Sequence, residues 1–137
     1  MNKKLVLGFS GGLDTSYCAV WLTEQGYDVH SVLVNTGGFD EEELKTIEAH
    51  AYKLGVKSHK TIDAVNSYYN NIVKFLVFGN VLKNNTYPLS VSAERLSQAL
   101  SIAAYAKELN ADAIAHGSTG AGNDQVRFDL VFNSLLP

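Results

Sequence analysis

The sequence predicts an α/β fold in which helices cover both faces of a doubly wound parallel sheet. Along most of the 137 residues, short apolar segments alternate with segments whose apolar residues repeat at helical spacing. Glycine-rich turns follow two of the expected strands. This alternation favours parallel strands joined by right-handed crossovers. We expect one domain over residues 1–137, because a chain of this length buries roughly two-thirds of its unfolded surface around one core.

The first expected strand ends in a glycine turn. Residues 5–9 are apolar, and residues 10–16 have the sequence SGGLDTS. The following residues predict a helix from about Asp14 to Gln25, with Gly26 ending it. Two adjacent glycines allow the backbone to approach a ligand closely, and the first N–H groups of a helix have no partner inside it. The turn therefore predicts an anion site, although a tight turn without a ligand is the simpler alternative.

The composition of this turn favours a polyphosphate over a single carboxylate. The hydroxyls of Ser10, Thr15 and Ser16 add donors around the same point. Two common phosphate motifs are excluded, because Leu13 and Asp14 stand where a Walker loop needs lysine or a dinucleotide fingerprint needs its third glycine.

A second strand and helix are expected next. Residues 29–34 are mostly β-branched, and the polar residues 35–38 follow them. Asp40 and Glu43 have the spacing of a capping box, and Gly55 is expected to stop the helix that follows. The expected core face of this helix consists of Leu44, Ile47, Ala51 and Leu54.

The middle of the chain predicts an edge strand, a helix and a loop. Residues 56–62 alternate with polar residues, which favours a strand near the edge of the sheet. Apolar residues then repeat at helical spacing over 65–76. Tyr68 and Tyr69 share that stripe, so core and rim positions are favoured over a base-stacking role. Residues 79–88 are polar and end in a Tyr-Pro pair, which predicts a loop.

One more helix and strand precede the second glycine-rich segment. The expected core face of the helix consists of Leu96, Ala99, Leu100, Ala103, Ala106 and Leu109. Residues 111–115 are short and apolar, as a central parallel strand should be. The sequence therefore predicts a further strand of the sheet directly before residues 116–129.

Residues 116–129, HGSTGAGNDQVRFD, form the second candidate functional segment. In an open parallel sheet, ligands bind beyond the carboxyl ends of the strands where the strand order reverses. Both glycine-rich segments follow strands, so we expect them at that edge. Between and after the glycines, Thr119, Asn123, Asp124 and Arg127 offer a hydroxyl, an amide, a carboxylate and a guanidinium. A flexible surface loop with an ordinary salt bridge is the alternative.

Composition narrows the possible partners and location. The net charge of −3 argues against a general nucleic-acid surface, so an anion site must be built locally. The single cysteine, Cys18, excludes an internal disulfide and is expected to be a small core residue. No apolar run reaches membrane-spanning length, and residues 1–4 show no signal-peptide pattern. We expect a cytoplasmic protein without membrane or nucleic-acid partners. No metal site is expected, because the four histidines have no i,i+4 pair.

Three motifs together resemble the argininosuccinate synthases. The SGGLDTS turn alone resembles the pyrophosphate loop that N-type ATP pyrophosphatases share, among them GMP synthase, NAD synthase and tRNA-modifying enzymes. With YPLSVSAER at 87–95 and HGSTGAGNDQVRFD at 116–129, the resemblance extends from about Lys3 to the last residue. It implies an adenine nucleotide alpha hydrolase-like fold and a ligase of arginine biosynthesis. Such an enzyme uses ATP with Mg²⁺ to join citrulline and aspartate through a citrullyl-adenylate, giving argininosuccinate, AMP and pyrophosphate.

The resemblance also implies site residues at the matching positions, with Asp14 and Asp124 as catalytic. The implied ATP-binding residues are Phe9, Ser10, Gly11, Gly12, Leu13, Asp14, Thr15, Ser16, Thr36 and Gly117. The implied citrulline-binding residues are Tyr87, Ser92, Asn123 and Arg127, and the implied aspartate-binding residues are Thr119, Asn123 and Asp124. Alternatives remain for three of them: Ser92 as an N-cap, Tyr87 as a packed loop anchor, and Arg127 as a structural partner of Asp124 or Asp129.

The chain departs from many members of that family at several positions. It has Ala121 where many have lysine and Phe9 where many have tyrosine, which removes one charge and one hydroxyl from the site. Residues 36–38 also differ from the usual sequence. Family members have some four hundred residues, with a second, synthetase domain and a segment used in tetramer assembly. We therefore expect this chain to be the nucleotide-binding part, inactive by itself. The competing hypotheses are a non-catalytic adenine-nucleotide-binding module and a different N-type ATP pyrophosphatase.

Overall fold

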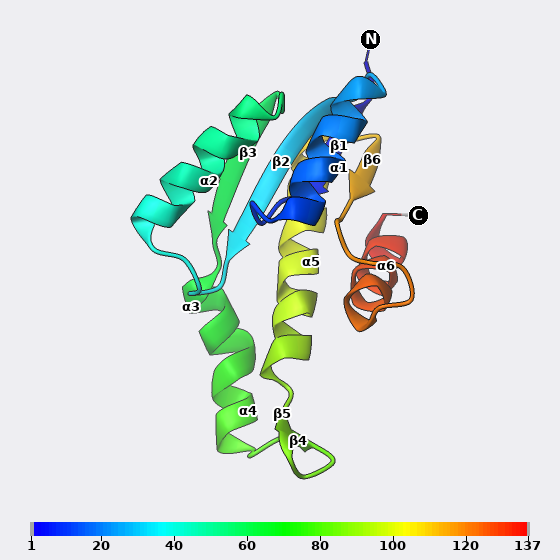
Figure 1. The fold of residues 1–137 in the computed structure, drawn as a ribbon. Helices are drawn as coiled ribbons and strands as arrows, with labels where there is room; N and C mark the ends of the chain where they lie inside the picture. Colours follow the sequence, from blue (N-terminus) through cyan, green and yellow to red (C-terminus); the bar gives the residue numbers. More distant parts are fainter. Residues whose placement is uncertain (1, 137) are drawn as a thin grey trace.

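A parallel sheet of four strands forms the centre of the molecule (Figure 1). The structure is a computed structural model that describes residues 2–136. The strands lie in the order β3 (Ser58–Asp63), β2 (Asp28–Asn35), β1 (Lys4–Gly8) and β6 (Ala113–Ala115). The chain builds outward from β1 to β3 and then crosses back to place β6 on the other side of β1. The strand order therefore reverses between β1 and β6, and the predicted α/β class is confirmed.

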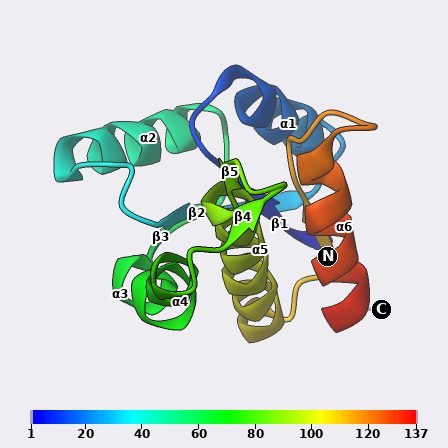
Figure 2. The same cartoon turned by 90° about the horizontal axis from the view of Figure 1, so that it is seen from below.

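Helices cover both faces of the sheet. On one face lie α1 (Leu13–Glu24) and α2 (Glu41–Lys53), and on the other lie α5 (Ser90–Leu109) and α6 (Asn123–Leu135) (Figure 2). The first pair packs on Leu5 and Leu7, and the second pair packs on Val6. The two cores therefore meet at β1. Its side chains alternate between them as a strand buried on both faces requires.

Local sequence signals set the boundaries of the first two helices as expected: a capping box begins α2, and a glycine follows the end of each helix. Asp40 accepts a hydrogen bond from the N–H of Glu43 at 2.8 Å, and the Glu43 carboxylate accepts one from the N–H of Asp40 at 2.9 Å. This is the predicted capping box. Gly26 and Gly55 follow the two helices with φ of +86° and +92°, conformations that favour glycine. The expected edge strand is also confirmed, since β3 ends the sheet.

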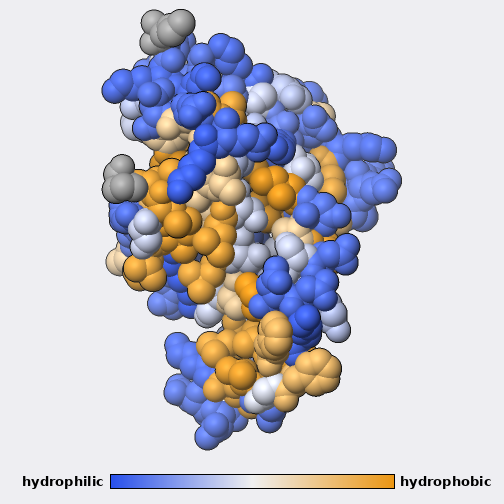
Figure 3. Space-filling model, turned by 180° about the vertical axis from the view of Figure 1, so that it is seen from behind, coloured by the Kyte–Doolittle hydropathy of each residue, from blue (hydrophilic) through white to orange (hydrophobic). Residues whose placement is uncertain are grey.

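A narrow lobe extends beyond the carboxyl ends of the strands (Figure 1). The predicted helix over 65–76 is present as three consecutive pieces: α3 (Val65–Tyr68), a π-helical turn η1 (Tyr69–Val73) and α4 (Lys74–Phe78). Figure 3 shows hydrophobic side chains gathered on this lobe. Those on α4 are Phe75, Val77 and Phe78, which are 60%, 69% and 86% exposed.

The expected loop over 79–88 contains a small hairpin that the sequence analysis missed. Its strands are β4 (Leu82–Lys83) and β5 (Tyr87–Pro88), which pair antiparallel. Asn84 and Asn85 have φ of 54° and 56°. Two consecutive residues with positive φ form the kind of turn that matches the twist of a hairpin, and asparagine tolerates it well.

Two expectations about α5 were wrong in detail. Leu96 and Leu100 are 38% and 50% exposed, because Ile102 and Tyr105 fill the core instead. Ser92 is not the N-cap, since the helix begins at Ser90.

Helix α6 was not predicted from the sequence, where residues 116–129 were expected as one glycine-rich segment. Asn123, Asp124 and Arg127 lie on its first turns rather than in the loop before it. The regular backbone of the helix sets the directions of these side chains.

Candidate functional site

A cavity of about 1000 Å³ lies at the switch edge of the sheet. Gly8 and Phe9 at the end of β1, Val32 and Val34 of β2, and the loop after β6 contribute to its wall. The remaining walls come from the starts of α1 and α6, one side of α5, and the hairpin. Its size and its place at the carboxyl ends of parallel strands match the usual ligand cavity of such folds.

The loop after β1 needs glycine at Gly11. This residue has φ of +78°, and an added Cβ would lie 3.0 Å from Cγ1 of Ile47 on α2. The neighbouring Ser10 and Thr15 hydroxyl oxygens lie 3.4 Å apart, and the Thr15 hydroxyl donates to the Gly12 carbonyl at 3.2 Å. The loop is therefore held by its own hydroxyls and by α2 beneath it.

The start of α1 has features that suit an anion. Its N-cap is Gly12, which makes no side-chain capping hydrogen bond. Gly12, Leu13, Asp14 and Thr15 all line the cavity. The first N–H groups of a helix carry partial positive charge, so this turn suits a phosphate group.

The loop after β6 touches the start of α1. A Cβ added at Gly117 would lie 2.8 Å from Cγ2 of Thr15 and 3.2 Å from its backbone nitrogen. A Cβ added at Gly120, in the same loop, would have no heavy atom within 4 Å. Glycine is therefore required at Gly117 by close contact, which joins the two glycine-rich segments into one site.

Charged side chains form a network across the cavity wall. Asp124 accepts hydrogen bonds from Arg95 at 3.1 Å and from Arg127 at 2.8 Å, and Arg127 also donates to the Ser92 hydroxyl at 2.8 Å. Burial acts to raise the pKa of Asp124, but the hydrogen bonds from the two arginines hold that pKa below its ordinary value of 3.8. The carboxylate is therefore ionised at neutral pH. The suggested partnership of Arg127 with Asp124 is present, and a partnership with Asp129 is not among the hydrogen bonds and ion pairs within residues 2–136.

Most of the expected site residues share this cavity. Those that line it are Phe9, Ser10, Gly12, Leu13, Asp14, Thr15, Tyr87, Ser92, Gly117, Thr119, Asn123, Asp124 and Arg127. Tyr87 is 58% exposed, so the alternative of a packed loop anchor is wrong.

Three expected ATP residues do not line the cavity: Gly11, Ser16 and Thr36. The Ser16 hydroxyl lies 3.0 Å from Nε2 of His50, and the Thr36 hydroxyl donates to the Glu94 carboxylate at 2.6 Å. Glu94 does line the cavity. Thr36 is therefore one hydrogen bond behind the cavity wall, whereas His50, the partner of Ser16, is not a cavity residue.

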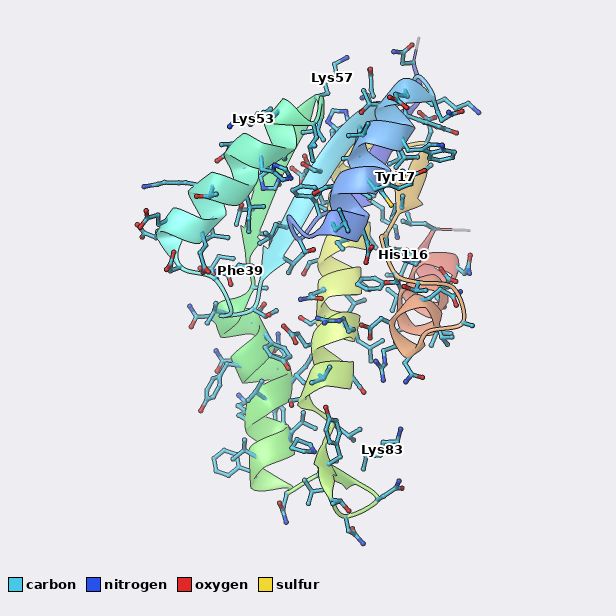
Figure 4. The ribbon with its side chains drawn as sticks, in the orientation of Figure 1. Tyr17, Phe39, Lys53, Lys57, Lys83 and His116 are labelled. Carbon is cyan, nitrogen blue, oxygen red and sulfur yellow. The ribbon has the colours of Figure 1, made fainter. Side chains whose placement is uncertain are left out.

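Several cavity residues were not predicted from the sequence. Figure 4 labels Phe39, Lys83 and His116, which line the cavity from the segment after β2, from the hairpin and from the end of β6. Arg95 was also missed, although it lies inside the quoted motif YPLSVSAER. Lys83 lies four residues before Tyr87, and Arg95 lies three residues after Ser92, so attention to charge near these two expected site residues would have detected both.

The departures at Phe9 and Ala121 have visible consequences. Phe9 is 3% exposed, and its ring packs near His50 and His59 at centroid distances of 6.3 and 6.1 Å. Ala121 has φ of +64°, which is uncommon for a residue with a side chain. Phe9 thus serves as core, and Ala121 occupies a strained turn in the loop before α6.

Neither a cluster of metal-ligating side chains nor a membrane-spanning helix is present within residues 2–136. No group of three or more histidine, cysteine, aspartate or glutamate side chains is arranged to hold a metal ion in this part of the chain. No helix within the same range is long and apolar enough to cross a membrane.

Comparison with known proteins gives a consistent family. A family model described as "Arginosuccinate synthase N-terminal HUP domain" matches residues 4–137. Argininosuccinate synthase of Xylella fastidiosa is 48% identical over 133 residues, which is 97% of this chain and 33% of the relative. The enzyme of Hyperthermus butylicus is 43% identical over 133 residues, 97% of this chain and 33% of the relative. The enzyme of Staphylococcus haemolyticus is 37% identical over 137 residues, 100% of this chain and 34% of the relative. The chain thus spans about a third of the length of these relatives.

Proposed function

Because the chain belongs to the argininosuccinate synthase family, we propose that its cavity is the ATP site of an enzyme that joins citrulline to aspartate. One observation carries the proposal. The glycine loop after β1 and the loop after β6 meet at Thr15 and Gly117, directly above the point where the strand order reverses. This arrangement supports a nucleotide whose phosphates lie against the start of α1.

The proposed reaction has two steps. The ureido oxygen of citrulline attacks the α-phosphorus of ATP, and pyrophosphate leaves. The amine of aspartate then attacks the activated ureido carbon, the bond to AMP breaks, and the amine loses a proton. Backbone N–H groups of residues 12–15 would hold the phosphates in place, which stabilises the charge on the departing pyrophosphate.

The substrate residues lie on the opposite wall of the same cavity. In the proposal, Tyr87, Ser92, Asn123 and Arg127 bind citrulline, and Thr119, Asn123 and Asp124 bind aspartate. The guanidinium of Arg127 suits a substrate carboxylate, and the ionised Asp124 suits an ammonium group. Arg127 and Asp124 pair with each other, which keeps both charges compensated before substrates arrive.

The residues present also fit a Mg²⁺ ion that accompanies ATP. Protein sites for Mg²⁺ commonly supply one or two carboxylates and leave the other positions to phosphate oxygens and water. Asp14 lines the cavity on the first turn of α1, so its carboxylate would hold the ion beside the phosphates. The ion, when bound, neutralises phosphate charge and polarises the bond to the leaving group.

Titration calorimetry on the 137-residue chain tests the phosphate assignment. The chain should bind Mg–ATP and pyrophosphate more tightly than AMP or adenosine, because helix N–H groups favour concentrated negative charge. Equal affinity for AMP and ATP would show that the loop after β1 does not hold the β- and γ-phosphates. That result would end the proposed function.

Turnover separates the catalytic proposal from a binding module. The chain spans a third of its relatives, so we expect it to bind Mg–ATP without forming argininosuccinate at rates typical of enzymes. Poor alignment of citrulline by itself costs about 10²-fold in rate. Citrulline-dependent exchange of pyrophosphate into ATP, even when slow, would favour the synthase over a nucleotide-binding module or another ATP pyrophosphatase.

The proposal also covers the oligomeric state and cellular location of the full-length protein. The family resemblance supports a cytoplasmic homotetramer, and it supports neither a nucleic-acid nor a membrane partner. Sedimentation equilibrium measures the mass of the particle directly. The proposed tetramer is that of the full-length protein, so its particle should have four times the mass of one full-length chain.

A further inference from the structure

We propose that His116 is a positioning residue of this site. Its neutral ring, protonated on Nε2, links Asp129 on α6 to the backbone of Ser118. The link fixes the turn that presses Gly117 against the start of α1. The inference rests on the proposed function of the cavity, because it explains how one wall of that cavity keeps its shape.

The two ring nitrogens of His116 have different partners. The backbone N–H of Ser118 donates to Nδ1 at 3.2 Å, and Nε2 lies 3.0 Å from a carboxylate oxygen of Asp129. A backbone N–H only donates, so Nδ1 must be unprotonated. An ionised carboxylate only accepts, so Nε2 must carry the proton. The contacts therefore select one neutral tautomer.

The partner carboxylate is ionised and oriented. The hydrogen bond from His116, and after it the one from Gln125, lower the pKa of Asp129 below its ordinary value. Gln125 donates to the second carboxylate oxygen. Since Gln125 and Asp129 lie one turn apart on α6, the helix itself aims the carboxylate at the ring.

Aromatic rings hold the imidazole plane. The ring of His116 stacks on Phe128 at 5.3 Å between centroids and 21° between planes, and Phe132 lies 6.1 Å away. The His116 side chain is 16% exposed. With both nitrogens bonded and its face covered, the ring has one orientation available.

The hydrogen bond between His116 and Ser118 fixes the position of Gly117, which lies between them. Gly117 lies between His116 and Ser118, and its Cα faces Thr15 with too little room for a Cβ. Releasing the Ser118 N–H would free the turn and loosen the contact between the two loops. The backbone N–H groups at the start of α1, which bind phosphate in the proposal, would then lose their packing against Gly117.

Two substitutions each keep one of the two hydrogen bonds of the His116 ring and remove the other. In His116→Asn, the side-chain oxygen takes the place of Nδ1 and accepts from the N–H two residues on, a common asparagine turn. In His116→Gln, the side-chain amide reaches the place of Nε2 and donates to Asp129, but Ser118 loses its acceptor. If His116 acts by positioning the turn, the asparagine variant rescues binding and the glutamine variant does not.

The experiment measures Mg–ATP affinity and ring protonation on the 137-residue chain. We expect His116→Asn to bind within about threefold of the unsubstituted chain and His116→Gln to bind about five- to tenfold more weakly, the range for one lost hydrogen bond. His30→Asn is the matched control, because His30 lies on β2 and is not among the cavity residues, and its side chain is hydrogen-bonded to Ser58. It should alter thermal stability and leave affinity unchanged.

Nitrogen-15 spectra of the imidazole test the tautomer independently of any ligand. They should show a protonated Nε2 and an unprotonated Nδ1 at His116, and the Ser118 amide shift should move in His116→Gln but not in His116→Asn. A protonated Nδ1, or equal affinities of the two variants, would overturn the inference. If the unsubstituted chain binds no Mg–ATP, the proposed function fails, while the spectra still decide whether His116 fixes the turn.

Discussion

At the scale of single residues, Gly117 and Thr15 decide whether the two glycine loops can share a ligand. Gly117→Ala places a methyl group 2.8 Å from Cγ2 of Thr15 and 3.2 Å from its backbone nitrogen, so the loop must move. We expect Mg–ATP affinity to fall at least about tenfold, because a displacement of 1 Å in a positioned site has effects of that order or larger. Calorimetric titration measures the change.

A matched glycine in the same loop provides the control. Gly120→Ala meets no heavy atom within 4 Å and should leave affinity unchanged. Equal losses in the two variants would mean that general loop stiffening, rather than contact with Thr15, weakens binding.

Arg127 is the residue whose proposed role is most open to test. Its guanidinium donates to Asp124 and to Ser92 at 2.8 Å each. In the proposal it also offers a citrulline carboxylate two parallel N–H groups, which a lysine ammonium cannot provide. Arg127→Lys should weaken citrulline binding at least tenfold while Mg–ATP affinity changes little, because losing one partner of a desolvated charge pair costs on the order of 2–5 kcal/mol. Citrulline titrated into the chain with Mg–ATP present gives the affinity. A lower melting temperature with unchanged citrulline affinity would make Arg127 a structural residue only.

At the scale of elements, α2 supports the first glycine loop from below. Its capping box orders the start of the helix that carries Ile47 to Gly11. Asp40→Ala should lower the free energy of unfolding by about 1 kcal/mol, the usual cost of losing such a cap. Denaturant melts measure it, with Lys45→Ala on the exposed side of the same helix as the control. A loss no larger than that of the control would contradict the capping role.

The contact between α5 and α6 should depend on pH. Hydrogen bonds from Arg95 and Arg127 keep the pKa of Asp124 below 3.8 despite its partial burial. A carboxyl whose pKa is lower in the folded state adds stability above its unfolded pKa and loses it as pH falls through the folded value. Melting temperatures of the unsubstituted chain and Asp124→Asn should therefore differ most near neutral pH and converge below 3.8. A constant difference across that range would contradict the assignment.

At the scale of the whole molecule, two cores share one sheet, so the chain should unfold as a unit. β1 contributes Val6 to one core and Leu5 and Leu7 to the other, and all three are at most 4% exposed. Far-ultraviolet circular dichroism and the fluorescence of the single tryptophan, Trp21 on α1, should follow the same denaturant transition. Separate transitions would show that the α1–α2 face unfolds independently of the α5–α6 face.

The sequence by itself determined the local features of this protein. Strand and helix alternation, the Asp40–Glu43 capping box and the ends at Gly26 and Gly55 depend on periodicity and on hydrogen bonds between near neighbours. The two glycine-rich segments were likewise visible, because each follows an apolar strand. The rule that ligands bind beyond the carboxyl ends of parallel strands then sufficed to predict that both segments lie at one edge.

The tertiary structure alone decided which residues meet at that edge. The contact of Gly117 with Thr15, the bonds of Arg95 to Asp124 and the link from His116 to Asp129 depend on strand order and on how α5 and α6 pack. Helix α5 shows the same limit: helical spacing correctly predicted that Ala99, Ala103 and Ala106 are buried, but it did not show that Leu96 and Leu100 lie at the exposed rim of that face. The physical reason is range: a motif records hydrogen bonds over a few residues, whereas contacts between distant residues are selected by the register and packing of the whole sheet.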